Sequence, residues 1–493
     1  MVFSSTVFLF WFLPATLLGY YLINPKLKNY FLLFMSLLFY AWGELSFVFI
    51  MLVSILINYF FALLIDRLQT ENGCRTLGGG QVNTDKMKPI HACRWAKLLL
   101  VLMIVFNLLI FIVFKYLNFL IENINIILTI NHITQLPQTN IHLPIGISFF
   151  TFQAMSYVFD VYYRKGNVQK NPLNTALYIT LFPQLIAGPI VRYQTVADEI
   201  DHRKENLTDF NRGIQRFAIG LTKKVALSNT LAVAADYIFN TNLSKTMTTG
   251  MGWLGAVTYS MQILFDFSGY SDMAIGLGLM LGFHFPENFD YPYTSKTISE
   301  FWRRWHISLG TWFRDYVYIP LGGSHIKNKK RLIINLFVVW LLTGIWHGAN
   351  WTFIIWGIFY FFLLTFEKLV GIKEKIRDSV IKVFFYRIFT LLCVMFGWVV
   401  FRSSNLKEAF TYISVMLGFS PAGIWNDTTS WLWKQYFVLL LISAIVCINW
   451  KSKFKFSKLI SNIIFPVFTI LTFLVSIAII VNSPYDPFIY FNF

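Results

Sequence analysis

Runs of apolar residues recur along the whole chain, and short polar or basic stretches separate them. Many of these runs approach the roughly 20 residues that a helix needs to cross a bilayer. The pattern therefore predicts an all-α polytopic membrane protein with about 11–12 transmembrane helices. We expect the spans near residues 3–23, 30–41, 45–65, 98–121, 144–162, 225–240, 253–280, 332–348, 351–367, 388–401, 432–449 and 460–482.

Composition supports this class of protein. The chain has 493 residues, of which 56% are hydrophobic and 13% are charged, whereas about a quarter of the residues in a soluble globular chain are charged. This difference excludes a large soluble protein with buried helices. The net charge of +17 would suggest a nucleic-acid partner in a soluble protein. Here the basic residues cluster between apolar runs, so we expect the lipid bilayer as partner and no nucleic acid.

The distribution of the basic residues predicts the orientation. Only Lys245, Arg402 and Lys407 fall in predicted outer loops, and Lys115 and Lys434 lie in or beside spans. The rest of the 41 Lys and Arg residues fall in the predicted inner loops, which is the positive-inside pattern. We expect both termini outside, and we interpret the N-terminal run as the first span and not as a removable signal peptide.

Three segments between the spans need separate interpretations. Segment 177–191 is apolar but broken by two prolines and a glycine, and both of its flanks are basic. We expect a re-entrant segment, which is tolerated where protein or a water-filled cavity covers it; a Pro-kinked crossing helix is the alternative. Segment 191–224 is predicted to form a pair of interfacial helices, and 66–97 a flexible cytoplasmic loop.

Cysteine and histidine spacing gives no sign of a metal site. The four cysteines form no CxxC or CxxH pair, and no two of the eight histidines have ligand spacing on a helix. Cys74 and Cys93 fall in the predicted cytoplasmic loop, where we expect reduced thiols.

One histidine lies deep in an apolar segment. His347 falls within a stretch from Leu332 to Phe366 that contains no Asp, Glu, Lys or Arg. A helix rising about 1.5 Å per residue would place it about 24 Å from Arg331. An ionisable residue at such depth is a functional candidate, and a buried neutral imidazole can act as a general base. A structural histidine that hydrogen-bonds a neighbouring helix is the open alternative, and Gly344 and Gly348 fit either a cavity or a close helix crossing.

A cationic, aromatic segment precedes this histidine. If 299–323 were helical, one face would carry Trp302, Trp305, His306, Leu309 and Phe313, and Arg303, Arg304 and Arg314 would point elsewhere. The segment is either an interfacial anchor or a cytoplasmic rim that binds an anionic ligand through arginine and tryptophan.

Three acidic residues fall in apolar runs. Asp160, Asp266 and Asp272 would be costly in contact with lipid. We expect them to face the interior of the helix bundle and to pair, with the arginines of 299–323 as candidate partners.

Several stretches together resemble the membrane-bound O-acyltransferase family, in its bacterial branch of alginate and peptidoglycan O-acetyltransferases. They are LPIGISFFTFQAMSYVFD, LYITLFPQLIAGPIVRY, FDFSGYSDMAIGLGLMLGFHFPENFDYPY, FWRRWHISLGTWFRDYVYIPLGG, LTGIWHGANWTFIIWG and the terminal SPYDPFIYFNF. The likeness runs in the same order from about residue 30 to the end, and only the loop 66–97 has no counterpart.

The resemblance implies a helical ring around a central tunnel, and one membrane-embedded domain over 1–493. The domain would contain the cytoplasmic-side segment 284–331 and a hairpin, 332–367, that carries the catalytic histidine. The resemblance implies catalytic roles for His347 and His306, whereas Ser156 and Ser308 are open candidates for an acyl carrier. We expect the substrate to be bound by Trp302, Arg303, Arg304, Trp305, Arg314 and Asn350.

The activity implied is transfer of an acyl group, expected to be acetyl, from cytoplasmic acetyl-CoA to an extracytoplasmic polysaccharide in the bacterial inner membrane. Acetyl-CoA would be a substrate, and we expect no permanently bound cofactor. A separate extracytoplasmic acceptor protein or glycan is expected as partner. The alternatives are a transporter of an anionic or lipid-linked metabolite and a scaffold for cell-wall assembly; neither would consume a thioester.

Overall fold

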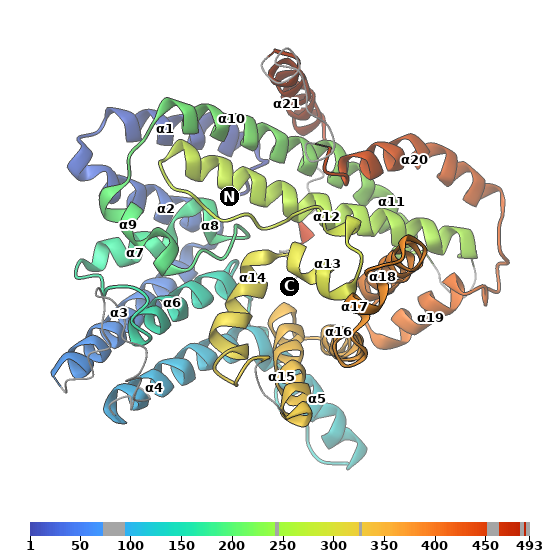
Figure 1. The fold of residues 1–493 in the computed structure, drawn as a ribbon, viewed down its shortest axis with the longest axis horizontal. Coiled ribbons are helices and arrows are strands. Elements are labelled where there is room, and N and C mark those ends of the chain that lie inside the picture. The colour runs from blue at the N-terminus through green and yellow to red at the C-terminus, as the bar shows by residue number, and fades with distance from the viewer. Residues whose placement is uncertain (72–93, 242–245, 325–327, 451–462, 484–487, 490–493) are drawn as a thin grey trace. The chain divides into compact units, whose positions relative to one another are not determined.

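The computed structural model describes residues 1–71, 94–241, 246–324, 328–450, 463–483 and 488–489, and these residues form helices and connecting loops without a β-strand (Figure 1). Seven helical stretches within them are long and apolar enough to cross a membrane. The prediction of an all-α polytopic membrane protein is therefore confirmed. The count of 11–12 spans and the orientation stay predictions, and the loop 72–93, with Cys74 and Cys93, lies outside the described residues.

The chain divides into two compact units. Unit 1 comprises residues 1–211 and 277–286, and unit 2 comprises 212–276 and 287–493. Two helices contribute to both units, α10 (Leu207–Thr222) and α12 (Thr249–Met280). The expectation of a single acyltransferase domain stays a prediction.

In unit 1, helices α3, α4 and α6 pack beside one another, and α2 packs on α7 (Figure 1). The helices of this unit are α1 (Leu13–Leu22), α2 (Lys28–Glu44), α3 (Val48–Glu71), α4 (Arg94–Phe111), α5 (Leu117–Ile130), α6 (Ile147–Tyr162), α7 (Pro172–Thr180), α8 (Phe182–Leu185) and α9 (Tyr193–His202).

In unit 2, α15 and α16 form the most extensively packed pair, and α16 also contacts α18. The helices of this unit are α11 (Thr230–Phe239), α13 (Ile298–Arg304), α14 (Ile307–Phe313), α15 (Lys329–His347), α16 (Trp351–Val370), α17 (Ile372–Ile376), α18 (Val380–Arg402), α19 (Leu406–Met416), α20 (Asp427–Val446) and α21 (Phe465–Asn482).

The segment 177–191 does not form one helix. Helix α7 ends at Thr180, and α8 is only four residues long. Pro183 follows the break, and a Cβ on Gly188 would lie 2.5 Å from the Cα of Gln184. This backbone is fully buried, as irregular structure at membrane depth must be. A single Pro-kinked crossing helix is therefore excluded, and the re-entrant path stays a prediction.

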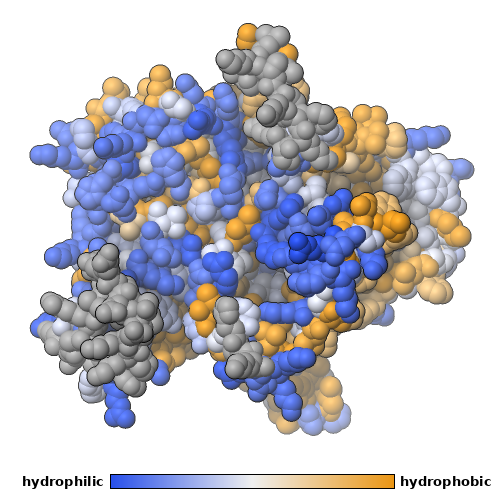
Figure 2. Space-filling model, viewed as in Figure 1, coloured by the Kyte–Doolittle hydropathy of each residue, from blue (hydrophilic) through white to orange (hydrophobic). Residues whose placement is uncertain are grey.

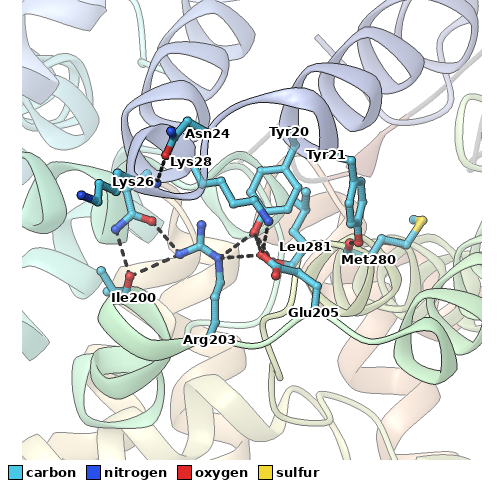
Figure 3. A network of polar contacts seen from close by, with 11 residues as sticks. Tyr20, Tyr21, Asn24, Lys26, Lys28, Ile200, Arg203, Glu205, Met280 and Leu281 are labelled. Carbon is cyan, nitrogen blue, oxygen red and sulfur yellow. Dashed lines mark hydrogen bonds and ion pairs between the residues drawn. The ribbon is translucent and has the colours of Figure 1, made fainter.

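A polar network joins the first helices of unit 1 to its C-terminal part (Figure 3). The hydroxyl of Tyr20 contacts the carboxylate of Glu205 and accepts a hydrogen bond from Nε of Arg203 at 2.8 Å. Lys28 forms an ion pair with Glu205 at 3.0 Å, and Tyr21 donates to the carbonyl of Met280 at 2.7 Å. The charged groups of this network are thus paired, which offsets the cost of partly removing them from water.

Glycines bring α10 and α12 into backbone contact within unit 2. A Cβ on Gly269 would lie 2.7 Å from the carbonyl oxygen of Gly220, and one on Gly276 would lie 2.6 Å from that of Gly213. The predicted helical pair in 191–224 is confirmed as α9 and α10. Since α10 packs so closely on α12, one of its faces is used for helix packing and not for contact with lipid headgroups.

The core of unit 2 is aromatic. Trp356, Tyr360 and Trp398 are fully buried, and their rings contact those of Trp302 and Trp305 at centroid distances between 4.7 and 6.3 Å. Such edge and offset contacts add about 0.5–1.5 kcal/mol per pair to the burial energy. This cluster holds the segment after α12 against α16 and α18.

The glycine contact predicts that Gly269→Ala destabilises the protein. The new methyl group would meet backbone atoms of α10 that cannot rotate away, so the helices must separate, at a cost of about 1–3 kcal/mol. Gly252→Ala is the matched control on the same helix, because its Cβ would lie 3.4 Å from the side chains of Val415 and Met416. Thermal unfolding in detergent should show a lower midpoint for Gly269→Ala only. Equal midpoints would contradict the close crossing.

Candidate functional site

His347 is the last residue of α15, and its ring is buried among aromatic side chains of unit 2. The ring centroid lies 5.0 Å from that of Trp356 and 5.1 Å from that of Phe401. Helix α15 runs unbroken from Lys329 to His347, so the predicted depth of the histidine holds if this helix spans the membrane.

Glycines allow the close contact of the two helices around His347. A Cβ on Gly344 would lie 2.5 Å from the carbonyl of Phe353, and one on Gly357 would lie 2.4 Å from that of Trp340. Of the two readings of these glycines, the structure therefore supports a close helix crossing.

His306 does not lie within a continuous helix, contrary to the helical face expected for 299–323. Helix α13 ends at Arg304, Trp305 is extended, and His306 has φ +45° and ψ +55°. This left-handed conformation costs a residue with a Cβ about 1–2 kcal/mol. The turn starts α14 at Ile307 and separates Trp302 from Leu309 and Phe313, so these residues do not form a single helical face.

The turn at His306 is fixed by Asn288. The main-chain carbonyl of Asn288 accepts from the Ile307 N–H at 2.9 Å. Its side-chain Oδ1 accepts from the N–H and the hydroxyl of Ser308 at 3.1 and 2.8 Å. The same Oδ1 lies 3.2 Å from Nδ1 of His306, and Nδ2 of Asn288 donates to Ser271 at 3.0 Å. One buried asparagine thus holds the backbone turn and the imidazole together.

The two histidines contact the same tryptophan. The ring centroid of Trp346 lies 6.0 Å from that of His306 and 4.9 Å from that of His347. Burial lowers the pKa of His306 to about 3, because a low-dielectric environment disfavours the imidazolium. The structure therefore brings His306 and His347 into contact with the same tryptophan, and their catalytic roles stay predictions.

Glu367 of α16 holds the start of the arginine-bearing helix α13. Its carboxylate accepts hydrogen bonds from the N–H groups of Ile298 and Ser299, both at 2.8 Å, and from the Ser299 hydroxyl at 2.6 Å. A carboxylate on free N–H groups is favoured by charge and by the helix dipole. Glu367 was not among the residues predicted for the site, because it lies 68 positions from Ser299.

Two adjoining clefts beside α13 and α17 are basic. The first has a volume of about 680 Å³, the second of about 630 Å³, and Arg303 and Lys373 line both. Within the described residues, no ion pair joins either side chain to a carboxylate. Figure 2 shows hydrophilic side chains gathered over these two helices. The remaining basic lining residues are Lys296, Arg304 and Arg377 in the first cleft and Arg314 and Lys368 in the second.

A separate polar and aromatic pocket of about 360 Å³ lies next to Phe401, whose ring separates it from His347. Phe353 and Phe401 line it, and Phe401 also contacts the His347 ring. Asn350, which caps α16, lines this pocket too, whereas Lys368 of α16 lines the second basic cleft. Eighteen residues of helix separate them, about 27 Å at 1.5 Å per residue. The pocket and the basic clefts therefore lie at opposite ends of α16.

The predicted substrate-binding residues fall into three places. Arg303, Arg304 and Arg314 line the basic clefts, although Arg304 pairs with Glu300 and Arg314 with Asp315. Trp302 and Trp305 pack in the aromatic core. Asn350 lies at the other end of α16. Sequence reasoning missed Asn288 and the clustering of Lys373 and Arg377 with Arg303, which no local pattern reveals.

The buried carboxylates pair, but with other cations than those proposed. Asp266 forms an ion pair with Lys224 at 2.7 Å, and both side chains are almost fully buried. Asp272 pairs with Arg216 and Lys223, both at 2.7 Å. Asp160 accepts a hydrogen bond from the N–H of Gln194 at 3.0 Å.

Comparison with known proteins shows the family to which the chain is similar. The model of the membrane-bound O-acyltransferase family matches residues 164–401, which include both histidines. A probable alginate O-acetylase of Pseudomonas aeruginosa is 43% identical over 86% of this chain and 76% of its own length. A peptidoglycan O-acetyltransferase of Helicobacter pylori is 33% identical over 86% and 81%. A teichoic acid D-alanyltransferase of Bacillus subtilis is 35% identical over 47% and 62%.

The match extends over most of the chain and includes the segment in which His306 and His347 meet Trp346. The chain therefore belongs to the membrane-bound O-acyltransferase family.

Proposed function

We propose that this acyltransferase takes an acetyl group from cytoplasmic acetyl-CoA and passes it across the bacterial inner membrane for O-acetylation of an extracytoplasmic polysaccharide. Peptidoglycan, alginate or a similar surface glycan would be the final acceptor. The observation that carries the proposal is the arrangement along α16, with basic clefts at one end and the pocket beside His347 at the other. The separation of about 27 Å is close to the thickness of the bilayer hydrocarbon, about 30 Å.

The donor would bind at the basic clefts. Acetyl-CoA carries phosphates, which guanidinium and ammonium groups bind through charge-assisted hydrogen bonds. Arg303, Lys373 and Arg377 have no carboxylate ion pair in the described part of the chain and are exposed. These groups lie on the side that the positive-inside pattern predicts to be cytoplasmic.

The acceptor would enter through the pocket beside His347. Its lining combines aromatic rings with polar groups, among them Asn350, Ser404 and Glu408. These polar groups offer hydrogen-bond donors and acceptors to a hydroxyl-bearing ligand, and the aromatic rings offer it an apolar face. The hydroxyl of a sugar, or of an acceptor protein, would hydrogen-bond to the polar groups while the rest of the molecule packs on the aromatic rings.

The chemistry proposed is direct acyl transfer. His347 would remove the proton from the acceptor hydroxyl, whose oxygen then forms a bond to the thioester carbonyl carbon. The carbon–sulfur bond breaks, the thiolate of coenzyme A receives a proton, and the acetyl ester leaves on the acceptor. His306 would assist at the same site.

A separate extracytoplasmic protein would complete the transfer to the glycan. The segments of this chain that are predicted to lie outside, near 122–143 and 402–431, are short and carry no predicted domain of their own. We therefore infer that the partner selects the polysaccharide.

His347→Ala should reduce the release of coenzyme A thiol from acetyl-CoA by at least roughly 100-fold, because a general base contributes 10²–10⁴-fold to the rate. Purified protein in nanodiscs, with acceptor and partner supplied, is the assay. His132→Ala is the control, since this histidine is exposed in unit 1. Unchanged turnover in a folded His347→Ala protein would make this histidine structural, and uptake of an anionic metabolite without thiol release would favour a transporter.

The double substitution Lys373→Glu and Arg377→Glu should raise the KM for acetyl-CoA at least roughly tenfold, because each reversal removes an attractive charge and adds a repulsive one. The kcat should stay within about twofold, since neither residue touches the histidines. Lys407→Glu is the matched charge reversal at an exposed site outside the clefts. An equal KM in the two proteins would exclude the clefts as the donor site.

Ser308→Ala should keep turnover within about threefold. Its hydroxyl donates to Asn288, and its N–H keeps the second bond to the same oxygen after substitution, so the loss is that of one buried hydrogen bond. Steady-state kinetics and mass spectrometry after acetyl-CoA addition would test this. A fall of more than 100-fold, with an acetyl group on wild-type Ser308, would instead establish an acyl-serine step.

A further inference from the structure

The side-chain oxygen of Asn288 can only accept hydrogen bonds, and the structure identifies it as an oxygen. It receives the backbone N–H of Ser308 at 3.1 Å, a donor whose direction is fixed. A flipped amide would place two donors against each other there. The other end of the amide donates to the hydroxyl of Ser271 at 3.0 Å, which agrees with this orientation.

The position of this oxygen determines which nitrogen of His306 carries hydrogen. Nδ1 lies 3.2 Å from Oδ1 of Asn288 and 3.5 Å from Oγ of Ser308. The Ser308 hydroxyl donates its hydrogen to Oδ1 at the shorter distance of 2.8 Å, so both oxygens face Nδ1 as acceptors, and a hydrogen bond to either requires hydrogen on Nδ1. A neutral imidazole carries one such hydrogen, so Nε2 holds a lone pair. The ring is neutral because it is buried. The rings of Phe267, Phe289 and Trp346 face it, and none of these side chains titrates.

The Nε2 lone pair is buried and has no hydrogen-bond partner in the described part of the chain. His306 is only 2% exposed. A buried acceptor left without a donor is destabilising, and the left-handed backbone of the residue adds to that cost. Both costs fall on one residue, whose ring contacts the same tryptophan as that of His347, and strain with unsatisfied groups is typical of functional sites.

Resting on the acyl transfer proposed above, we propose that Asn288 is a positioning residue that holds His306 as its Nδ1–H tautomer, so that Nε2 presents a lone pair, and no hydrogen, to the reacting groups. His306 therefore starts the reaction as an acceptor. It can protonate the leaving thiolate only after it has received the proton that His347 removed from the acceptor hydroxyl, which defines the order in which the two histidines act. Asn288 acts through the histidine and touches no substrate.

The first test is Asn288→Leu, which keeps the size of the side chain and the main-chain bond to Ile307 but removes the acceptor. The kcat should fall roughly 100-fold, the lower range for acid–base catalysis, with little change in the KM for acetyl-CoA. Ser271→Ala is the matched control, because it removes only the partner of Nδ2. Its kcat should stay within about threefold.

The second readout is the tautomer itself. In protein with ¹⁵N-labelled histidine rings, solid-state NMR distinguishes a protonated from an unprotonated ring nitrogen, and His306→Gln identifies the signal. Wild type and Ser271→Ala should show Nδ1–H and a bare Nε2, and Asn288→Leu should lose this preference. A wild-type ring protonated on Nε2, or an Asn288→Leu protein that loses activity with the tautomer unchanged, would overturn the proposal.

Asn288→Asp provides a test if the leucine variant does not fold. Its carboxylate keeps an acceptor at the same place, so the Nδ1–H tautomer and at least about a tenth of the wild-type kcat should remain. The new charge stabilises the imidazolium, so activity should fall with acid at a higher pH than in the wild type. A folded but inactive protein, or an unchanged pH profile, would contradict the proposal. Because the NMR signal needs no turnover, an inactive wild type would refute the acyl transfer separately.

Discussion

The cost of burying a polar group without a partner governs how unit 2 is built. Its core is apolar and aromatic, and a buried charge there is tolerated only when it is paired and hydrogen-bonded. Asp266 is therefore matched by Lys224, Asp272 by Arg216 and Lys223, and Glu367 by the N–H groups that start α13. These pairings fix the helices around the two histidines. Nε2 of His306 is one of several buried polar atoms of unit 2 that have no hydrogen-bond partner within the described residues. It differs from the others because its residue has a left-handed backbone and its ring contacts Trp346, as the ring of His347 also does.

The sequence predicted what depends on length and local pattern. A run without charges from Leu332 to Phe366 is long enough for two helices, with His347 and Gly348 at the break between them, and α15 and α16 take these positions. The pairing of the buried carboxylates could be predicted because an unpaired charge in hydrocarbon is energetically costly. The catalytic roles of His306 and His347 were predicted from motifs that resemble those of a family. The position of His347 in the sequence did not by itself distinguish a general base from a structural histidine.

What the sequence could not show depends on contacts between distant segments. The periodicity of 299–323 is helical, yet the helix breaks at His306 because Asn288, eighteen positions earlier, binds both the turn and the ring. A left-handed residue with a Cβ has no local signal, since glycine is the usual choice there. Likewise, Lys373 and Arg377 join Arg303 in one cleft only because α17 folds back toward α13.

Helix α16 sets the distance and the relative orientation of the pocket near His347 and the basic clefts. Its first turn carries Asn350 and Phe353 beside His347, and its last turn carries Glu367, which holds α13. Inserting one residue in its middle would rotate the distal part by about 100° and advance it by about 1.5 Å. Glu367 would then turn away from α13 while the histidine end stayed in place. The spacing within this helix is therefore a constraint on evolution, in which substitutions are tolerated far more readily than insertions or deletions.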